Sequence, residues 1–376
     1  MTKSAEVSAS PRFFPGLESL RGFAALLVAL YHVSWRSHFA YSNFVRNGAL
    51  MVDFFFILSG FVLFHSYGAK LGTLARSLRF MAIRFGRLYP LHLASLAAFV
   101  LIECAKWTAI HWRLAAVAGV PFHPNTPGAL IANLLLIHGL GIYDQPTWNN
   151  PSWSISVEFY IYALFALVVS LLPRKLPLLA VSGALASVGL VISWKAAGGL
   201  DSTAKYGFFR GLLGFFCGVI LWHVYNGLRG RTPPRILGAM NLVLGAALAI
   251  FLTVLHRGLG DFIAIPLFIA IVLITALHDA VRPNPLDWRG VVWLGTISYS
   301  VYMVHPVVIW CFEFVLQYVL KLPRPDYYAM NIWTGDAVVI LYSAVVLAVS
   351  AWTFRHIEDR FRRKIRRAVE NRPHQK

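Results

Sequence analysis

Ten long apolar segments constrain the fold of this chain more than any other feature of its sequence. A helix needs about 20 apolar residues to cross a bilayer core, and backbone polar groups at that depth must be paired within the protein. The sequence therefore predicts an all-α integral membrane protein, with about ten transmembrane helices in a single bundle. The segments lie at residues 17–36, 49–67, 88–108, 153–172, 177–195, 206–226, 236–255, 260–278, 290–310 and 334–354.

The composition excludes a soluble globular domain. Hydrophobic residues make up 58% of the chain and charged residues 13%, whereas soluble domains carry about 25% charged residues. The net charge of +18 would favour nucleic acid in a soluble chain, but here most Lys and Arg lie between apolar segments, as topology signals do. We therefore expect no nucleic-acid partner. The cysteines, which lack metal-ligand or CxxC spacing, predict no metal site; they are Cys104, Cys217 and Cys311.

The distribution of positive charge predicts the orientation. With the amino terminus in the cytoplasm, 24 of the 34 Lys and Arg residues fall on the cytoplasmic side, and both termini lie there. This count includes Lys3, Arg12, Arg282 and the basic tail 355–376. In that tail, apolar residues recur every fourth position, which predicts an amphipathic helix on anionic membrane lipid; they are Phe361, Ile365 and Val369.

The apolar stretch 128–143 does not fit the alternation of sides, because a full span there would place Arg174 and Lys175 outside. We interpret it as a re-entrant or interfacial helix. Irregular backbone at membrane depth is tolerated where it lines a cavity, so this element, beside the sequence WNNPSW, predicts a cavity open to the outside. Asn150 and Trp153 in that sequence are candidates for substrate binding.

Arg21 and His32 are ionisable residues within the first apolar segment. Eleven helical steps place them on one helix face, roughly 16 Å apart. Ionisable groups inside a membrane are functional by default, and a neutral imidazole near pH 7 suits a general base. The alternative is a positive-inside anchor and a histidine satisfied within the helix bundle.

Two carboxylates on the predicted outer side are candidates to orient His32. Ser154 and Glu158, four residues apart, share one helix face, and a lone carboxylate at depth costs on the order of 3 kcal/mol. A contact between Glu158 and His32 would join a general base to its orienting acid; a structural contact between helices is the alternative. Asp53 begins the second apolar segment and is either a second such acid or a helix N-cap.

Arg84 and Arg87 form an RxxR sequence at the predicted inner surface, with Arg79 before it and Pro90 after it at an expected helix start. Guanidinium groups suit phosphates, although a positive-inside cluster would also explain them. Arg210, within 206–226, requires a carboxylate or a ligand.

Five sequence elements in chain order resemble the membrane-bound acyltransferase-3 family, which modifies bacterial surface sugars and related acceptors. The resemblance covers nearly the whole chain, and five elements in order make it specific. They are the R-x10-H of Arg21 and His32, VDFFFILSG, the RxxR of Arg84 and Arg87, SWSISVE, and the SYSVYMVHP that contains Tyr299 and His305.

The resemblance implies a ten-helix protein of the bacterial inner membrane, with both termini in the cytoplasm. It also implies transfer of an acyl group, most often acetyl, from cytoplasmic acyl-CoA to a hydroxyl of a carbohydrate or glycolipid acceptor. Acyl-CoA is then a donor substrate, and no permanently bound cofactor is expected. The chain resembles the single-domain members, so we treat residues 1–376 as one domain. Acceptor identity, acyl length and oligomeric state do not follow from these motifs.

Our hypothesis from the sequence assigns three groups of residues. Arg84, Arg87 and Arg79 hold the CoA phosphates. His32, Arg21 and Ser154 are assigned to catalysis. Glu158 or Asp53 is the acid that orients the histidine. The remaining candidates bind substrate: Trp153, Asn150, Arg210, Tyr299 and His305. The alternative function is a transporter or flippase with a buried polar pathway.

Two departures from the family pattern bear on this hypothesis. Asp359 and Arg360 follow Ile357-Glu358 where the family commonly has a basic residue and proline, and the stretch after Arg210 lacks an acidic partner.

Overall fold

The computed structural model describes residues 13–112, 120–172, 174–197, 199–256, 258–281, 284–321 and 330–370. These residues form helices and connecting turns without any strand, so the predicted all-α membrane bundle is confirmed. The predictions made for Lys3, Arg12, Arg282 and residues 371–376 lie outside the described residues.

The α-helices follow one another with short connections. In chain order they are α1 (Pro15–Tyr31), α2 (Asn43–Arg46), α3 (Met51–Tyr67), α4 (Leu74–His111), α5 (Pro127–Leu134), α6 (Trp153–Leu171), α7 (Lys175–Ala197), α8 (Gly207–Leu228), α9 (Pro234–Val254), α10 (Ala264–Asp279), α11 (Arg289–Thr296), α12 (Ser298–Phe314), α14 (Ile332–Thr353) and α15 (Asp359–Glu370).

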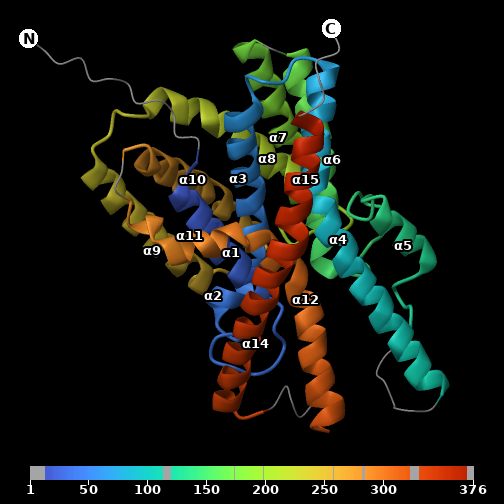
Figure 1. Cartoon of the computed structure of the whole chain (residues 1–376). Helices are drawn as coiled ribbons and strands as arrows, with labels where there is room; N and C mark the ends of the chain where they lie inside the picture. Colours follow the sequence, from blue (N-terminus) through green and yellow to red (C-terminus); the bar gives the residue numbers. More distant parts are fainter. Residues whose placement is uncertain are drawn as a thin grey trace, which may run out of the picture.

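Within the described ranges, nine helical stretches are long and apolar enough to cross a membrane. The one predicted segment that is not among these nine is 17–36, which corresponds to α1. This helix has 17 residues and lies among the other helices, in contact with α3, α10, α11 and α12 (Figure 1). Small residues on α1 permit this close packing: a Cβ on Gly22 would lie 2.6 Å from the backbone nitrogen of Gly295. The helix that carries Arg21 is therefore held by neighbours from both ends of the chain.

The start of α4 differs from the prediction. The helix has 38 residues and begins where Thr73 caps it by accepting a hydrogen bond from Arg76 N at 3.3 Å, well before the predicted span 88–108. Pro90 lies inside this helix, so its assignment to a helix start was wrong. Membrane helices tolerate interior proline because neighbouring groups satisfy the freed carbonyl. As a result, Arg84 and Arg87 lie several turns inside a continuous helix.

The predicted span 290–310 was also wrong in its bounds. The backbone breaks at Ile297, and the spanning stretch is Ser298–Val319, which is α12 followed by a π-helical turn at Val315–Val319. The separate helix α11 packs across α1, where a Cβ on Gly295 would meet the Glu18 carbonyl oxygen at 1.9 Å. Apolar residues on α11 made the two helices look like one segment in the sequence.

The stretch 128–143 is short of a membrane span. It forms α5, only eight residues long, and then irregular backbone that leads to a 3-10 turn at Asn150–Ser152. Protein groups satisfy this backbone: Gly139 N donates to Ser156 Oγ at 3.0 Å, and Gly141 N donates to Ala204 O at 3.0 Å. Irregular backbone buried in protein in this way is compatible with membrane depth.

The carboxyl-terminal helices form a nearly continuous rod. A π-helical turn at Phe354–Glu358 joins α14 to α15, and the rod runs back along the bundle so that α15 lies against α4 (Figure 1, red). Ile365 packs against Gly86, where a Cβ would meet its Cδ1 at 2.6 Å. The predicted helix of the tail is therefore present as α15, but it continues from α14 and places Ile365 against α4; its attachment to anionic lipid stays a prediction. No proline separates residues 332 and 370, so the helix continues.

Candidate functional site

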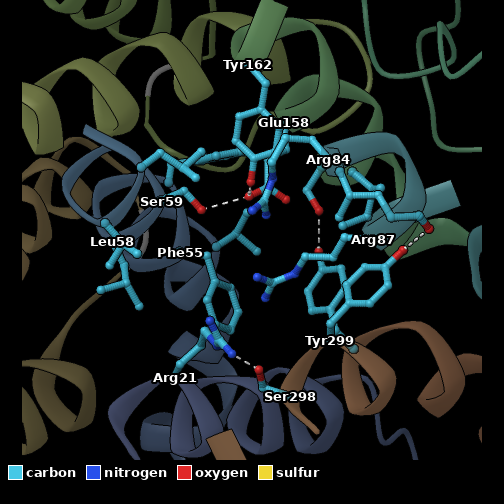
Figure 2. Close-up of a pocket in the computed structure, with 18 residues that line it drawn as sticks. Arg21, Phe55, Leu58, Ser59, Arg84, Arg87, Glu158, Tyr162, Ser298 and Tyr299 are labelled. Atoms are coloured by element: carbon cyan, nitrogen blue, oxygen red, sulfur yellow. Dashed lines mark hydrogen bonds between the residues drawn. The ribbon is translucent and has the colours of Figure 1, made fainter. Parts of the chain in front are cut away.

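A pocket between α1, α3, α4, α6 and α12 gathers charged groups from distant parts of the chain. It encloses about 830 Å³ of empty space, counting its open mouth. Arg21, Arg84, Arg87 and Glu158 all line it, and Arg87 extends from α4 into the space between Arg21 and Glu158 (Figure 2). The structure thus brings together the first sequence motif, the RxxR motif and the predicted acid.

Arg84 is a buried cation that retains hydrogen-bonding capacity. Its exposed fraction is 8%, and its guanidinium carbon lies 5.0 Å from the centre of the Tyr162 ring. Its Nε is buried without a hydrogen-bond partner, and no described carboxylate lies within ion-pair distance of Arg84 or Arg87. Buried cations are normally paired, so Arg84, together with the half-buried Arg87, leaves a positively charged wall of the pocket available to an anion.

Arg21, by contrast, is held in place by the protein. It pairs with Glu18 one turn earlier on α1, and its Nη2 donates to Gly295 O at 3.1 Å. Its Nε donates to Ser298 Oγ at 2.9 Å. These bonds connect α1 to α11 and to the start of α12. Arg21 therefore provides a fixed positive charge at the pocket wall.

Glu158 makes contacts other than the predicted one. Its Oε1 accepts hydrogen bonds from Ser59 Oγ at 2.7 Å and from the Tyr162 hydroxyl, one turn along the same helix. Neither it nor Asp53 bonds His32, so the prediction that one of these acids orients the histidine was wrong. The reason is that nearer donors from α3 and α6 occupy Glu158.

His32 lies beyond the residues that line the pocket, at the end of α1. Its Nδ1 is 2.8 Å from Val28 O and 3.3 Å from Nε2 of His305, which is fully buried. His32, which we predicted to be the base, and His305, which we predicted to bind substrate, are therefore in direct contact.

Asp53 and Arg210 form a buried ion pair. Arg210 Nε lies 2.8 Å from Oδ1 and Nη2 lies 2.7 Å from Oδ2 of the carboxylate, and the side chains are 2% and 0% exposed. Arg210 also donates to Ser202 O and Ala49 O, and it lies 5.6 Å from the centre of the Trp153 ring. The carboxylate that Arg210 requires thus comes from α3 rather than from its own helix. Asp53 is neither a helix N-cap nor a partner of His32.

The other predicted residues lie at different distances from the pocket. Ser154 lines it, and its Oγ is 2.8 Å from the Tyr302 hydroxyl. Tyr299 also lines it and donates to Leu88 O at 2.5 Å. Asn150 is exposed, Trp153 is buried against Arg210, and Arg79 is half-buried outside the pocket lining.

The sequence analysis missed Glu358. This residue is 2% exposed in the π-helical turn before α15, and its Oε2 accepts a hydrogen bond from Ser300 Oγ at 2.8 Å. Arg87 and Arg21 attract its charge. Because residues 355–376 were interpreted as a surface tail, its carboxylate was not considered. The available signal was the pair of acids Glu358 and Asp359 just after an apolar segment, within a largely basic stretch.

The fold and the site together define a class of protein: a membrane bundle of many helices with an internal pocket lined by arginines. The profile of a known family, described as an acyltransferase domain, matches residues 14–355, and the chain belongs to this acyltransferase-3 family. No solved structure matches the chain.

Three curated relatives show the range of similarity. The putative peptidoglycan O-acetyltransferase YrhL of Bacillus subtilis is 28% identical over 79% of this chain and 49% of its own length. The acyltransferase MdmB of Streptomyces mycarofaciens is 32% identical over 43% of this chain and 41% of its own. The O-acetyltransferase OatA of Staphylococcus aureus is 24% identical over 96% of this chain and 59% of its own. The chain thus spans roughly half the length of these relatives.

Proposed function

We propose that this protein is an O-acyltransferase that moves an acyl group from acyl-CoA to a hydroxyl of a carbohydrate-containing acceptor. The observation that carries the proposal is the pair of guanidinium groups, Arg84 and Arg87, which line the pocket and form no ion pair with any carboxylate of the described ranges. Membership of the acyltransferase-3 family and the names of the relatives support the reaction class. The two names with O-acetyltransferase make acetyl the first donor group to test.

The donor fits the pocket by charge and by side of the membrane. Phosphate accepts bidentate hydrogen bonds from guanidinium groups, and the phosphates of CoA would supply acceptors to the Arg84 guanidinium, whose buried Nε has no partner among the described residues. Arg21 and Arg84 belong to the first halves of α1 and α4, which begin on the cytoplasmic side in the orientation favoured by the charge distribution. Arg79, a half-buried residue outside the lining, would add positive charge near the entrance. We accordingly place the protein in the bacterial inner membrane, with both termini cytoplasmic.

The transfer step uses His32. Its imidazole takes the proton of the acceptor hydroxyl, whose oxygen then attacks the thioester carbonyl carbon. The carbon–sulfur bond breaks, and the CoA sulfur leaves with the proton that His32 held. His32 caps α1 eleven positions after Arg21, a helical rise of roughly 16 Å, so the acyl-pantetheine arm has to extend along this helix toward the outer side.

The geometry gives less support to a transporter. A translocation route requires the buried polar groups to line one pathway. Arg21 and Glu158 line the pocket, whereas Asp53 and Arg210 satisfy each other away from it. Release of free CoA in step with acceptor acylation separates the two functions, because transport alone does not cleave a thioester.

The direct test measures free CoA released from acetyl-CoA by the protein purified in lipid, with a panel of surface-sugar acceptors. We expect acceptor-dependent release by the wild type and a loss of roughly 10³-fold or more in His32→Ala. The exposed histidine His356 supplies the matched control, His356→Ala, which should release CoA like the wild type. Undiminished release by folded His32→Ala protein would contradict the assigned base. Absence of release with any acyl-CoA would favour transport.

A further inference from the structure

The contact between His32 and His305 fixes which ring nitrogen of each residue carries a proton. The Nδ1 atom of His305 lies 3.2 Å from Val301 O, and the Nδ1 atom of His32 lies 2.8 Å from Val28 O. A carbonyl oxygen only accepts hydrogen bonds, so both Nδ1 atoms are the protonated ones. In a neutral imidazole, the other nitrogen is then an acceptor.

The remaining distance agrees with this assignment. Nε2 of His305 lies 3.3 Å from Nδ1 of His32, so the bare nitrogen of the buried ring faces the N–H of the other. The His32 proton is thereby shared between Val28 O and His305 Nε2. The Nε2 atom of His32 has no hydrogen-bond partner among the described residues. It is also not among the fully buried polar atoms, so part of its surface is accessible.

We infer that His305 is a positioning residue, which holds the His32 ring in the Nδ1–H tautomer and leaves the Nε2 lone pair available to the acceptor hydroxyl. The inference rests on the proposed role of His32 as the base. A triad carboxylate acts on its histidine in the same way, by accepting from Nδ1–H and fixing the ring. Here a neutral imidazole takes that place, which suits a fully buried position where a charge would be costly.

The surroundings of His305 support a role through His32 rather than in contact with substrate. His305 is 0% exposed, lies outside the pocket lining and packs beside the Tyr302 ring, with 6.0 Å between ring centres. Its rotation is restricted by the bond to Val301 O one turn earlier. This rigid second ring limits rotation of His32 at the end of α1, where helical restraint ceases.

Two conservative variants separate orientation from packing. In His305→Gln, the amide reaches the position of Nε2 and offers an oxygen to His32 Nδ1–H. In His305→Asn, the shorter amide reaches only the position of Nδ1, next to Val301 O. We expect the Gln variant to keep kcat within about threefold and the Asn variant to lose roughly tenfold or more, with the KM for acyl-CoA unchanged in both.

Three outcomes of this experiment are decisive. A kcat lost in Asn and retained in Gln, at equal thermal stability, supports the inference. Equal kcat values in the two variants, whether both normal or both impaired, overturn it, because the reach of the amide would then be irrelevant. Full activity of His32→Ala in the same assay contradicts the proposed function instead, so the two failures are distinguishable.

A second measurement does not depend on activity. The protonated and bare nitrogens of a neutral imidazole give well-separated 15N resonances, and the difference between spectra of wild type and His32→Ala in lipid isolates His32 among the 13 histidines. We expect Nδ1 of His32 to be protonated and Nε2 bare in the wild type. A protonated Nε2 in the neutral ring would overturn the inference even if neither His305 variant folds.

Discussion

Arg84 and Arg210 are two buried arginines in different environments. Arg210 has a carboxylate on its guanidinium, two backbone carbonyls and an indole ring beside it. Arg84 has a phenol ring beside it, a buried Nε without a partner, and an open pocket in front of it. Both are no more than 8% exposed, so burial alone does not distinguish them.

The difference indicates which arginine serves the fold and which is available to the proposed ligand. A satisfied buried ion pair stabilises one arrangement of helices, and here it ties α3 to α8. A cation with unsatisfied donors beside a pocket is stabilised fully only when an anion binds. The same residue type in the same membrane thus acquires its role from the partners that the fold supplies.

Removal of Arg210 has the largest expected effect on stability. Arg210→Leu leaves the Asp53 carboxylate buried without its guanidinium, which costs about 3–5 kcal/mol of folding free energy. We expect a large loss of folded protein, measured by thermal unfolding in detergent and by size-exclusion chromatography. The double variant Asp53→Leu with Arg210→Leu removes both charges and should recover much of the loss. If it is no more stable than the single variant, the pair is not the source of the effect.

Removal of Arg84 should weaken donor binding while the fold persists. Arg84→Gln deletes a charge-assisted contact to phosphate, so we expect the KM for acyl-CoA to rise roughly 10- to 100-fold. The change in unfolding free energy should stay within about 1 kcal/mol, since no carboxylate of the described residues pairs with Arg84 and would be left alone. Comparable destabilisation in Arg84→Gln and Arg210→Leu would remove the distinction between the two arginines.

Glu358 lies between these two cases, because it is buried near Arg87 but bonded to Ser300. Glu358→Gln retains a hydrogen-bond acceptor for Ser300 and removes the charge that attracts Arg87. We expect a change of only about threefold in the KM for acyl-CoA, with little loss of stability. Glu358→Leu, which lacks the acceptor, is the control. Equal stability of the Gln and Leu variants would show that the Ser300 bond contributes nothing.

Cys217 has the smallest expected effect. It lies on α8, the helix of Arg210, but outside both the ion pair and the pocket lining. Cys217→Ala should change stability by less than about 1 kcal/mol and leave CoA release unchanged. A large loss of activity in this variant would indicate a role for α8 that the comparison of the arginines does not include.

Much of the fold followed from the sequence because apolar length is a local property. The ten segments identified the spanning helices, and the need of Arg210 for a carboxylate was apparent. The predicted bounds of the helices were wrong where a helix continues into polar sequence beyond the apolar stretch, as in the first turns of α4 and in α15. A break between two apolar helices, such as that at Ile297, was hidden for the same reason.

The site was harder to predict because it depends on which helices touch. Arg21, Arg84, Arg87 and Glu158 could be selected one by one as ionisable groups near membrane depth, and the structure gathers them at one pocket. Their pairings could not be selected in that way. The partner of Asp53 is 157 residues away and that of His32 is 273 residues away. No local pattern distinguishes such a partner from the other acids and histidines of the chain.

Binding of CoA to the purified protein in lipid nanodiscs tests the central claim most directly. The comparison requires the wild type, Arg84→Gln, and Arg46→Gln as the matched control, since Arg46 is an exposed arginine on α2. We predict that the Kd for CoA rises at least about tenfold in Arg84→Gln and is unchanged in Arg46→Gln. Equal affinity of Arg84→Gln and the wild type would contradict the assignment of this pocket to the donor.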